Sequence, residues 1–337
     1  MNRGISPVLL SLSSLLTLWF GGCRPAGAAP AVGRPAEGAV LAPGEMDPVA
    51  RGALTAEVNR RRRAVPASFR AVAEVRAQIG NLDARKRGRY AVIGPVLKGM
   101  GSDALWPMLE QLALDGGDRV GVPDSAWLAW RVGLIEAVGS LRDPRSGPVL
   151  RAVLDRAGTG GARGLSEDEF QVARAAAEAL GSLGDDASAA RLGELANRPG
   201  PARRAVLAGM GTCRRLVCTQ VLAAALDGKL DAALAEEVVQ SLGATGNAWA
   251  WKTPAVSEAA GKGEQTAVRA AAAEALIGAF IAYGADAGVR QAASNALMVV
   301  DFSGTPALVA RARGAAAPRD AAALDDLAAR FARNPTR

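Results

Sequence analysis

One short phrase recurs along this chain. Its clearest copy, RAAAEALGSLGD, covers residues 174–185, and related copies begin at Arg131, Arg204 and Glu236. When the copies are aligned, an apolar residue precedes a glycine in each, and a further side chain follows two positions beyond that glycine. The apolar residues are Val138, Leu180, Met210 and Leu242; the glycines are Gly139, Gly181, Gly211 and Gly243; the later residues are Leu141, Leu183, Cys213 and Thr245. Repeats spaced by roughly 30–45 residues are typical of stacked units that bury their apolar faces only against their neighbours.

The repeated unit has the pattern of an amphipathic helix. Ala176, Ala179, Leu180 and Leu183 fall on one helical face. Gly181 at that face would let a neighbouring helix approach closely. Short polar residues in the turns after the repeated helices are suited to cap the next helix, and Ser166 with Glu169 has the spacing of a capping box; the turn residues are Asp143, Asp185 and Asn247. No long run alternates apolar and polar residues, so the sequence predicts an all-α fold without a sheet.

The phrase R-A-A-x-A-L-G-x-L-G-D resembles HEAT repeats, especially the short bacterial repeats of phycobilisome-lyase-like proteins. The resemblance is strongest over residues 131–155 and 170–196, and it implies an α-solenoid of stacked antiparallel helix pairs. We expect this HEAT-like superhelix over residues 87–337, ending in a capping helix at 321–332, with a basic helical segment before it at 51–86. Helices are expected at 89–100 and 105–114 as one pair, and at 268–283 and 289–300 as another. Such motifs are specific for a fold and nearly silent on function.

The first residues have the pattern of an export signal. Residues 1–22 contain Arg3 and a mostly apolar run that is short for a membrane-spanning helix of about 20 residues. Gly21, Gly22 and Cys23 resemble the lipobox of bacterial lipoproteins, in which the cysteine is acylated, although Phe20 stands where leucine is usual. Cleavage after Ala28 is the alternative, and it would give a soluble periplasmic or secreted protein.

A Pro-, Ala- and Gly-rich stretch follows the signal. Residues 23–50 show no apolar period and are expected to be a flexible tether. In bacterial lipoproteins an Asp after the cysteine favours retention in the inner membrane. Arg24 occupies that position here, so the resemblance favours the outer membrane.

Positive charge is concentrated near the start of the predicted folded part. The chain carries a formal net charge of +7, whereas residues 51–100 alone contain ten Arg and two Lys against three acidic residues. Arg60, Arg61, Arg62 and Arg63 form an unbroken run. The run is suited to bind anionic lipid head groups, an anionic polysaccharide or an acidic protein; alternatively it is a solvated helix face. Export argues against nucleic acid as the partner.

Two cysteines remain once Cys23 is assigned to the lipobox. Cys213 falls in the buried position of the repeat, and Cys218 falls in the first turn of the following helix. Residues five apart in one helix are too distant to bridge, but across a helix–turn boundary they can reach each other. A disulfide and two buried thiols are both compatible with the sequence, and the spacing is not that of a C-x-x-C redox site.

Trp249 and Trp251 interrupt the helical pattern close to Lys252. Large aromatic residues in an irregular segment anchor binding interfaces. The alternative is that both rings fold back and cover the end of a helix pair.

The chain has no histidine. It therefore lacks Ser–His–Asp and Cys–His nucleophile arrangements and histidine-ligated metal sites, and we expect neither an enzyme nor a bound metal or cofactor. The sequence predicts a non-catalytic, lipid-anchored scaffold of the bacterial envelope that binds another protein. One alternative is a basic module in residues 51–100 that binds a membrane surface or polyanion. A second, from the resemblance to lyase-like repeat proteins, is an enzyme accessory.

Overall fold

A computed structural model of the chain describes residues 40–115, 119–159, 164–228, 230–253 and 263–334. Over these residues the protein is helical and contains no strand. The N-terminal elements are α1 (Pro48–Ala64), α2 (Pro66–Ala77), α3 (Ile79–Asp83), α4 (Gly94–Lys98), the 3-10 turn η1 (Ser102–Ala104) and α5 (Leu105–Ala113). The all-α prediction is confirmed for the described residues.

The remaining helices follow the repeats. They are α6 (Asp124–Leu141), η2 (Pro144–Ser146), α7 (Gly147–Gly158), α8 (Glu167–Leu183), α9 (Asp186–Asn197), α10 (Arg203–Gly209), η3 (Met210–Thr212), α11 (Leu216–Asp227), α12 (Ala232–Thr245), η4 (Ala250–Lys252), α14 (Glu264–Ala282), α15 (Ala287–Val300), α16 (Thr305–Ala315) and α17 (Pro318–Ala332). The repeated phrase lies in α6, α8, α10 with η3, and α12. We call these four, together with α15, the first helices.

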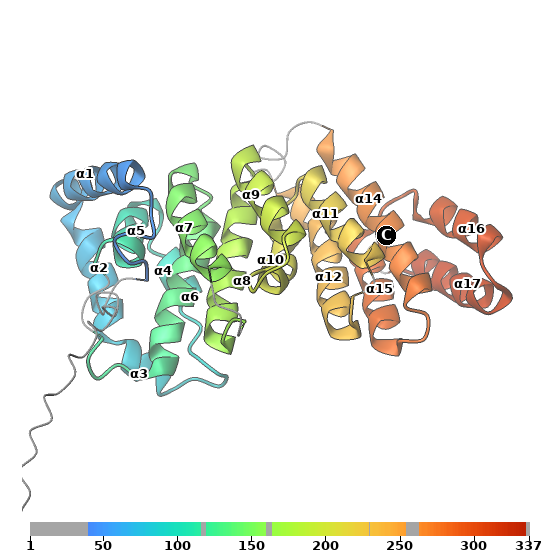
Figure 1. The fold of residues 1–337 in the computed structure, drawn as a ribbon, viewed down its shortest axis with the longest axis horizontal. Helices are drawn as coiled ribbons and strands as arrows, with labels where there is room; N and C mark the ends of the chain where they lie inside the picture. Colours follow the sequence, from blue (N-terminus) through green and yellow to red (C-terminus); the bar gives the residue numbers. More distant parts are fainter. Residues whose placement is uncertain (1–39, 116–118, 160–163, 229, 254–262, 335–337) are drawn as a thin grey trace, which may run out of the picture. The chain divides into compact units, whose positions relative to one another are not determined.

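Each first helix packs against the next first helix. The contacts run from α6 to α8, α8 to α10, α10 to α12 and α12 to α15 (Figure 1). The intervening second helices contact one another in the same order, from α7 through α9, α11 and α14 to α16. Each of the first four second helices also touches the first helix that follows it. The units therefore bury their apolar faces against sequence neighbours, as the repeat spacing predicts.

The repeated glycine is where successive first helices meet. A Cβ added at Gly139 would lie 2.5 Å from Cα of Ala179, and one at Gly181 would lie 2.7 Å from the backbone nitrogen of Cys213. The same position in the next copies faces Ala244 and Ser241 (from Gly211) and Ala296 (from Gly243), with closest approaches of 2.9 and 2.8 Å. Any side chain at these positions would push the neighbouring helix away, so the glycine fixes the distance between units.

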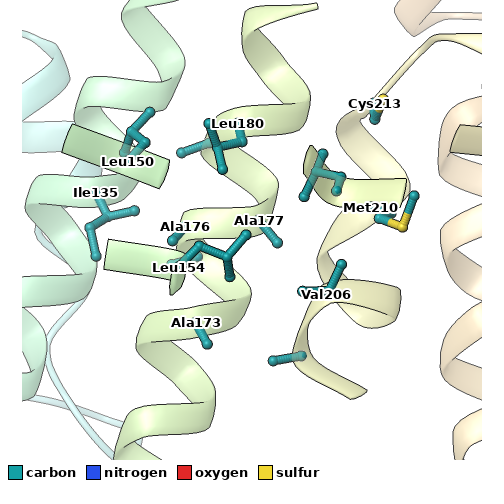
Figure 2. Close-up of a cluster of buried hydrophobic side chains, with 14 of the residues drawn as sticks. Ile135, Leu150, Leu154, Ala173, Ala176, Ala177, Leu180, Val206, Met210 and Cys213 are labelled. Atoms are coloured by element: carbon teal, nitrogen blue, oxygen red, sulfur yellow. The ribbon is translucent and has the colours of Figure 1, made fainter. Parts of the chain in front are cut away.

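The apolar residue before each glycine fills the core between units. Val138, Leu180, Met210 and Leu242 are all fully buried, with relative exposures of 0%. Figure 2 shows Leu180 of α8 among side chains from α6, α7, α10 and η3. Burying one such side chain contributes about 1.5–3 kcal/mol, so the repeats hold most of the apolar core.

Short polar residues begin many of the helices. The predicted capping box is confirmed: Ser166 accepts from the amide of Glu169, whose carboxylate accepts from the amide of Ser166. Asp185 caps α9, and Asp143 caps the turn before α7. Asn247 instead accepts from the amides of Trp249 and Ala250, and so shapes the irregular segment rather than a second helix.

Three expectations differ from the structure. The stretch expected as a tether to residue 50 is folded from Val40 onward, because Val40 and Leu41 are buried and α1 begins at Pro48. The helix expected at 89–100 is reduced to α4, and residues 84–93 are not helical. Helices α14 and α15 do contact each other, but α14 is the second helix after α12, and α15 begins the next unit. The segment around Trp249 separates α12 from α14 in the sequence, so the pairing of these two helices is not evident from the spacing.

Candidate functional site

A groove of about 330 Å³ crosses three successive first helices. Its floor is made by small residues of α10 and η3, and its walls are side chains of α8 and α12. The floor residues are Ala208, Gly209, Gly211 and Thr212; the wall residues are Arg174 and Glu178 on one side and Glu237, Gln240, Ser241 and Ala244 on the other. The groove forms where α10 presents Ala208 and Gly209, which have little or no side chain.

Hydrogen bonds between neighbouring units hold the groove in shape. The hydroxyl of Thr212 donates to the carbonyl of Glu178 at 2.6 Å, and the hydroxyl of Ser241 donates to the carbonyl of Ala208 at 3.0 Å. Gly209 lies against α8, where a Cβ would be 2.7 Å from the carbonyl oxygen of Arg174. The groove is thus part of the same close contact that joins α8, α10 and α12.

Both walls carry paired charges. Arg174 Nε lies 3.0 Å from Glu178 Oε1 within α8. Arg204 of α10 makes two hydrogen bonds to Glu237 of α12, one of them 3.2 Å long, and this bonding raises the pKa of Arg204. The walls therefore present guanidinium and carboxylate groups that are already paired with each other. Such pairs are better suited to bind the polar groups of a ligand than to transfer protons.

A carboxylate with a different environment lies next to this groove. Glu136 of α6 is partly buried, and burial together with the nearby charge of Glu178 raises its pKa. It packs so closely on the start of α4 that a Cβ at Gly94 would be 2.5 Å from its Oε2 atom. Burial likewise raises the pKa of Tyr90, and the negative charges of Glu136 and Glu178 raise it further. The electrostatic influence of Glu178 therefore extends from the groove to Glu136 and Tyr90.

A second groove, of about 410 Å³, lies between α15 and α17. Arg330 on its rim hydrogen-bonds the side chains of Ser294 and Asn295, and Arg290 lies over the ring of Phe280 at 4.6 Å. This groove involves the last helix rather than the repeated register. We therefore take the α8–α12 groove as the candidate site.

The two tryptophans of the irregular segment have opposite environments. Trp251 is 2% exposed, and its ring nitrogen donates to the carbonyl of Thr245 at 2.9 Å. Trp249 is 62% exposed, and the Lys252 ammonium lies 4.1 Å from the centre of its ring. The interpretation that both rings fold back therefore holds for Trp251 alone, and the ring of Trp249 is exposed on the surface.

The arginine run on α1 is mostly engaged within the protein. Arg60 and Arg61 bond Glu57, whose pKa these hydrogen bonds lower. Arg62 bonds Glu110 of α5 and lies 4.5 Å from the ring centre of Phe69. Arg63 is exposed and makes no ion pair with the residues described. The run is a packed helix face more than a free basic patch.

Cys213 and Cys218 form a disulfide across the turn between η3 and α11, with Cα atoms 6.2 Å apart. Both cysteines are buried. The bridge encloses Arg214, whose pKa burial lowers to about 10. Arg215 in the same turn pairs with Asp186 and Glu264, at 2.7 and 2.9 Å. The turn is therefore closed covalently by the disulfide and tied by ion pairs to α9 and α14.

Other predicted features stand as follows. Cys23 lies outside the described residues. Within them, no group of three or more His, Cys, Asp or Glu side chains could hold a metal ion. Among the same residues one helix, α14, is long and apolar enough to cross a membrane; it packs on α11, α12, α15 and α16.

Comparison with protein-family models gives no match, and comparison with curated proteins gives none either. The function must therefore be argued from the geometry. Sequence reasoning had not singled out the groove walls. They lie on the polar side of the repeated helices, opposite the apolar face that the repeat defines, and that polarity was the available signal.

Proposed function

We propose that this protein is a non-catalytic scaffold that binds another protein along its first helices. The observation that carries the proposal is the repeated glycine contact, which joins the first helices into one continuous layer. In the proposed arrangement the layer is a HEAT-like α-solenoid, and stacked helix pairs of that kind offer extended binding surfaces. The α8–α12 groove supplies a polar binding position on this layer.

The proposal includes export and lipid attachment at Cys23, which would place the scaffold in the bacterial envelope, with the outer membrane favoured. It is supported by the signal-like residues 1–22 and by the small residues before Cys23. The absence of histidine from the sequence supports a non-catalytic role.

Site-specific photocrosslinking in the native host tests the binding layer. A photoreactive residue at Gln240, on the groove wall, should give one discrete crosslinked protein. The matched control is Ala190, an exposed position on the second helix α9, which should give none. Equal crosslinking at the two positions, or no crosslink at Gln240, would contradict the proposed binding surface.

The lipid anchor has its own test. Intact mass of the protein purified from its host should show a chain beginning at Cys23 with added acyl mass, and the Cys23→Ser variant should lack that mass. A chain beginning near Ala29 without acyl mass would remove the anchor from the proposal and leave a periplasmic or secreted scaffold.

A further inference from the structure

The loop between α3 and α4 is closed by one buried carboxylate, that of Asp83. Asp83 is 3% exposed; its Oδ1 accepts from the amide of Ala91 at 3.2 Å, and its Oδ2 accepts from Lys86 Nζ and Ser125 Oγ at 2.5 Å each. These hydrogen bonds lower the pKa of Asp83 against the opposing effect of burial. The two ends of the loop therefore meet at Asp83, which is also hydrogen-bonded to Ser125 of α6.

The basic residues of this segment fall into two groups. Lys86 and Arg89 are tied down, the first to Asp83 and the second to Asp168 at 2.5 Å. Arg85, Arg87 and Lys98 are exposed, and none of them forms an ion pair with a residue that the structure describes. The segment from Asp83 to Lys98 thus has two cations in ion pairs and three that are exposed without one.

Exposed aliphatic side chains accompany these cations. Val92 is 73% exposed and Val96 is 52% exposed, although Ile93 and Leu97 beside them are buried against the rest of the protein. Seven large hydrophobic residues are exposed in the described part of the chain, and two of the seven, Val92 and Val96, lie only four residues apart. Basic residues interleaved with exposed aliphatic ones are typical of surfaces that lie on an anionic bilayer.

We infer that Arg85, Arg87, Val92, Val96 and Lys98 form a surface that binds an anionic phospholipid bilayer. The more basic run on α1 is less suited to this role, because three of its four arginines are in ion pairs with Glu57 or Glu110. The inference deepens the proposed function, since it concerns how an envelope scaffold would sit on its membrane.

Vesicle flotation tests the inference without the lipid anchor. The chain from Arg24 to Arg337, which contains every described residue, is mixed with phosphatidylcholine vesicles or with vesicles that also contain phosphatidylglycerol. It should bind only the anionic vesicles, and salt should weaken that binding. The variant Arg85→Gln/Arg87→Gln should bind at least tenfold more weakly. Val92→Ser/Val96→Ser should lose the binding that persists in high salt.

The matched control is Arg63→Gln/Arg70→Gln, which removes two exposed charges from α1 and α2; it should bind like the unchanged protein. Circular dichroism melts confirm that each variant is folded. No binding to anionic vesicles would overturn the inference. It would also be overturned if the control lost as much binding as the loop variant. The Gln240 crosslink uses another surface, so it can succeed or fail independently.

Discussion

The repeated glycines of the first helices and the arginine run of α1 both stand out in the sequence. In the structure the glycines share one environment, whereas the arginines do not. Gly139, Gly181, Gly211 and Gly243 are far apart in the chain and all do the same thing: each meets the next first helix. The four consecutive arginines have different surroundings. A helix turns by about 100° per residue, so neighbours in sequence face different directions, whereas residues one repeat apart occupy equivalent places. Periodicity is therefore the safer guide to a shared role.

The largest effect should come from the apolar position before the glycine. Leu180→Ala removes a fully buried side chain between units and should lower the free energy of unfolding by about 2–5 kcal/mol. Urea denaturation measures this, and Val217→Ala, at a 45% exposed position on α11, is the control with little change. A small effect of Leu180→Ala would show that the repeat does not form the core.

The disulfide should have the next largest effect, because it fixes the backbone on which Gly181 packs. Replacing both cysteines, Cys213→Ala/Cys218→Ala, should cost about 2 kcal/mol through loop-closure entropy. A reducing agent should lower the denaturation midpoint of the unchanged protein and leave that of the variant where it is. Identical midpoints with and without reductant would mean that the bridge does not hold this turn.

Substitutions within the arginine run should change the free energy of unfolding by different amounts. Arg62→Gln removes the partner of Glu110 and the contact with Phe69, so it should lower the free energy of unfolding by about 1 kcal/mol. Arg63→Gln should leave it unchanged. Thermal melts of the two variants side by side give the comparison, and equal losses would contradict the separate roles assigned to these neighbours.

Replacing Glu136 should have the smallest effect. It should raise the free energy of unfolding rather than lower it, by an amount that depends on pH. Burial raises the pKa of Glu136, so the folded state binds its proton more tightly than the unfolded state does. Ionised Glu136 therefore opposes folding at neutral pH, and this cost disappears as the pH falls through its raised pKa toward the ordinary value of 4.5.

Glu136→Gln should therefore be more stable than the unchanged protein at neutral pH, with a difference that shrinks on acidification. Denaturation curves over this pH range measure it, and Glu74→Gln, at an exposed position on α2, is the control. A variant that is less stable than the unchanged protein at neutral pH would show that Glu136 has a favourable partner.

Much of the helical order could be predicted from the sequence, because the repeat carries it. The positions of α6 to α12, the burial of Cys213 and the capping box at Ser166 all follow from apolar spacing and local capping. The assignment of α14 as a second helix could not be predicted. The Trp249 segment separates it from α12, and only the packing of α12 on α15 shows the register.

The candidate site was less predictable than the fold. The groove depends on Gly209 facing α8, which is a property of packing between units. The conformation of the loop between α3 and α4 depends on hydrogen bonds from Ala91 and Ser125 to the side chain of Asp83. A charge count over residues 51–100 could not tell cations in ion pairs from cations without one.

The most direct test of this account is to add one methyl group at the repeated glycines. Gly139→Ala, Gly181→Ala and Gly243→Ala should each lower the free energy of unfolding by about 1–3 kcal/mol, because the new Cβ would overlap the next first helix. Gly278→Ala is the matched control: it lies inside α14 with no atom within 4 Å of the added Cβ, and it should gain about 0.5–1 kcal/mol from helix propensity. If the repeated positions also gained stability, the glycines would not set the contact between units, and the proposed layer of first helices would be wrong.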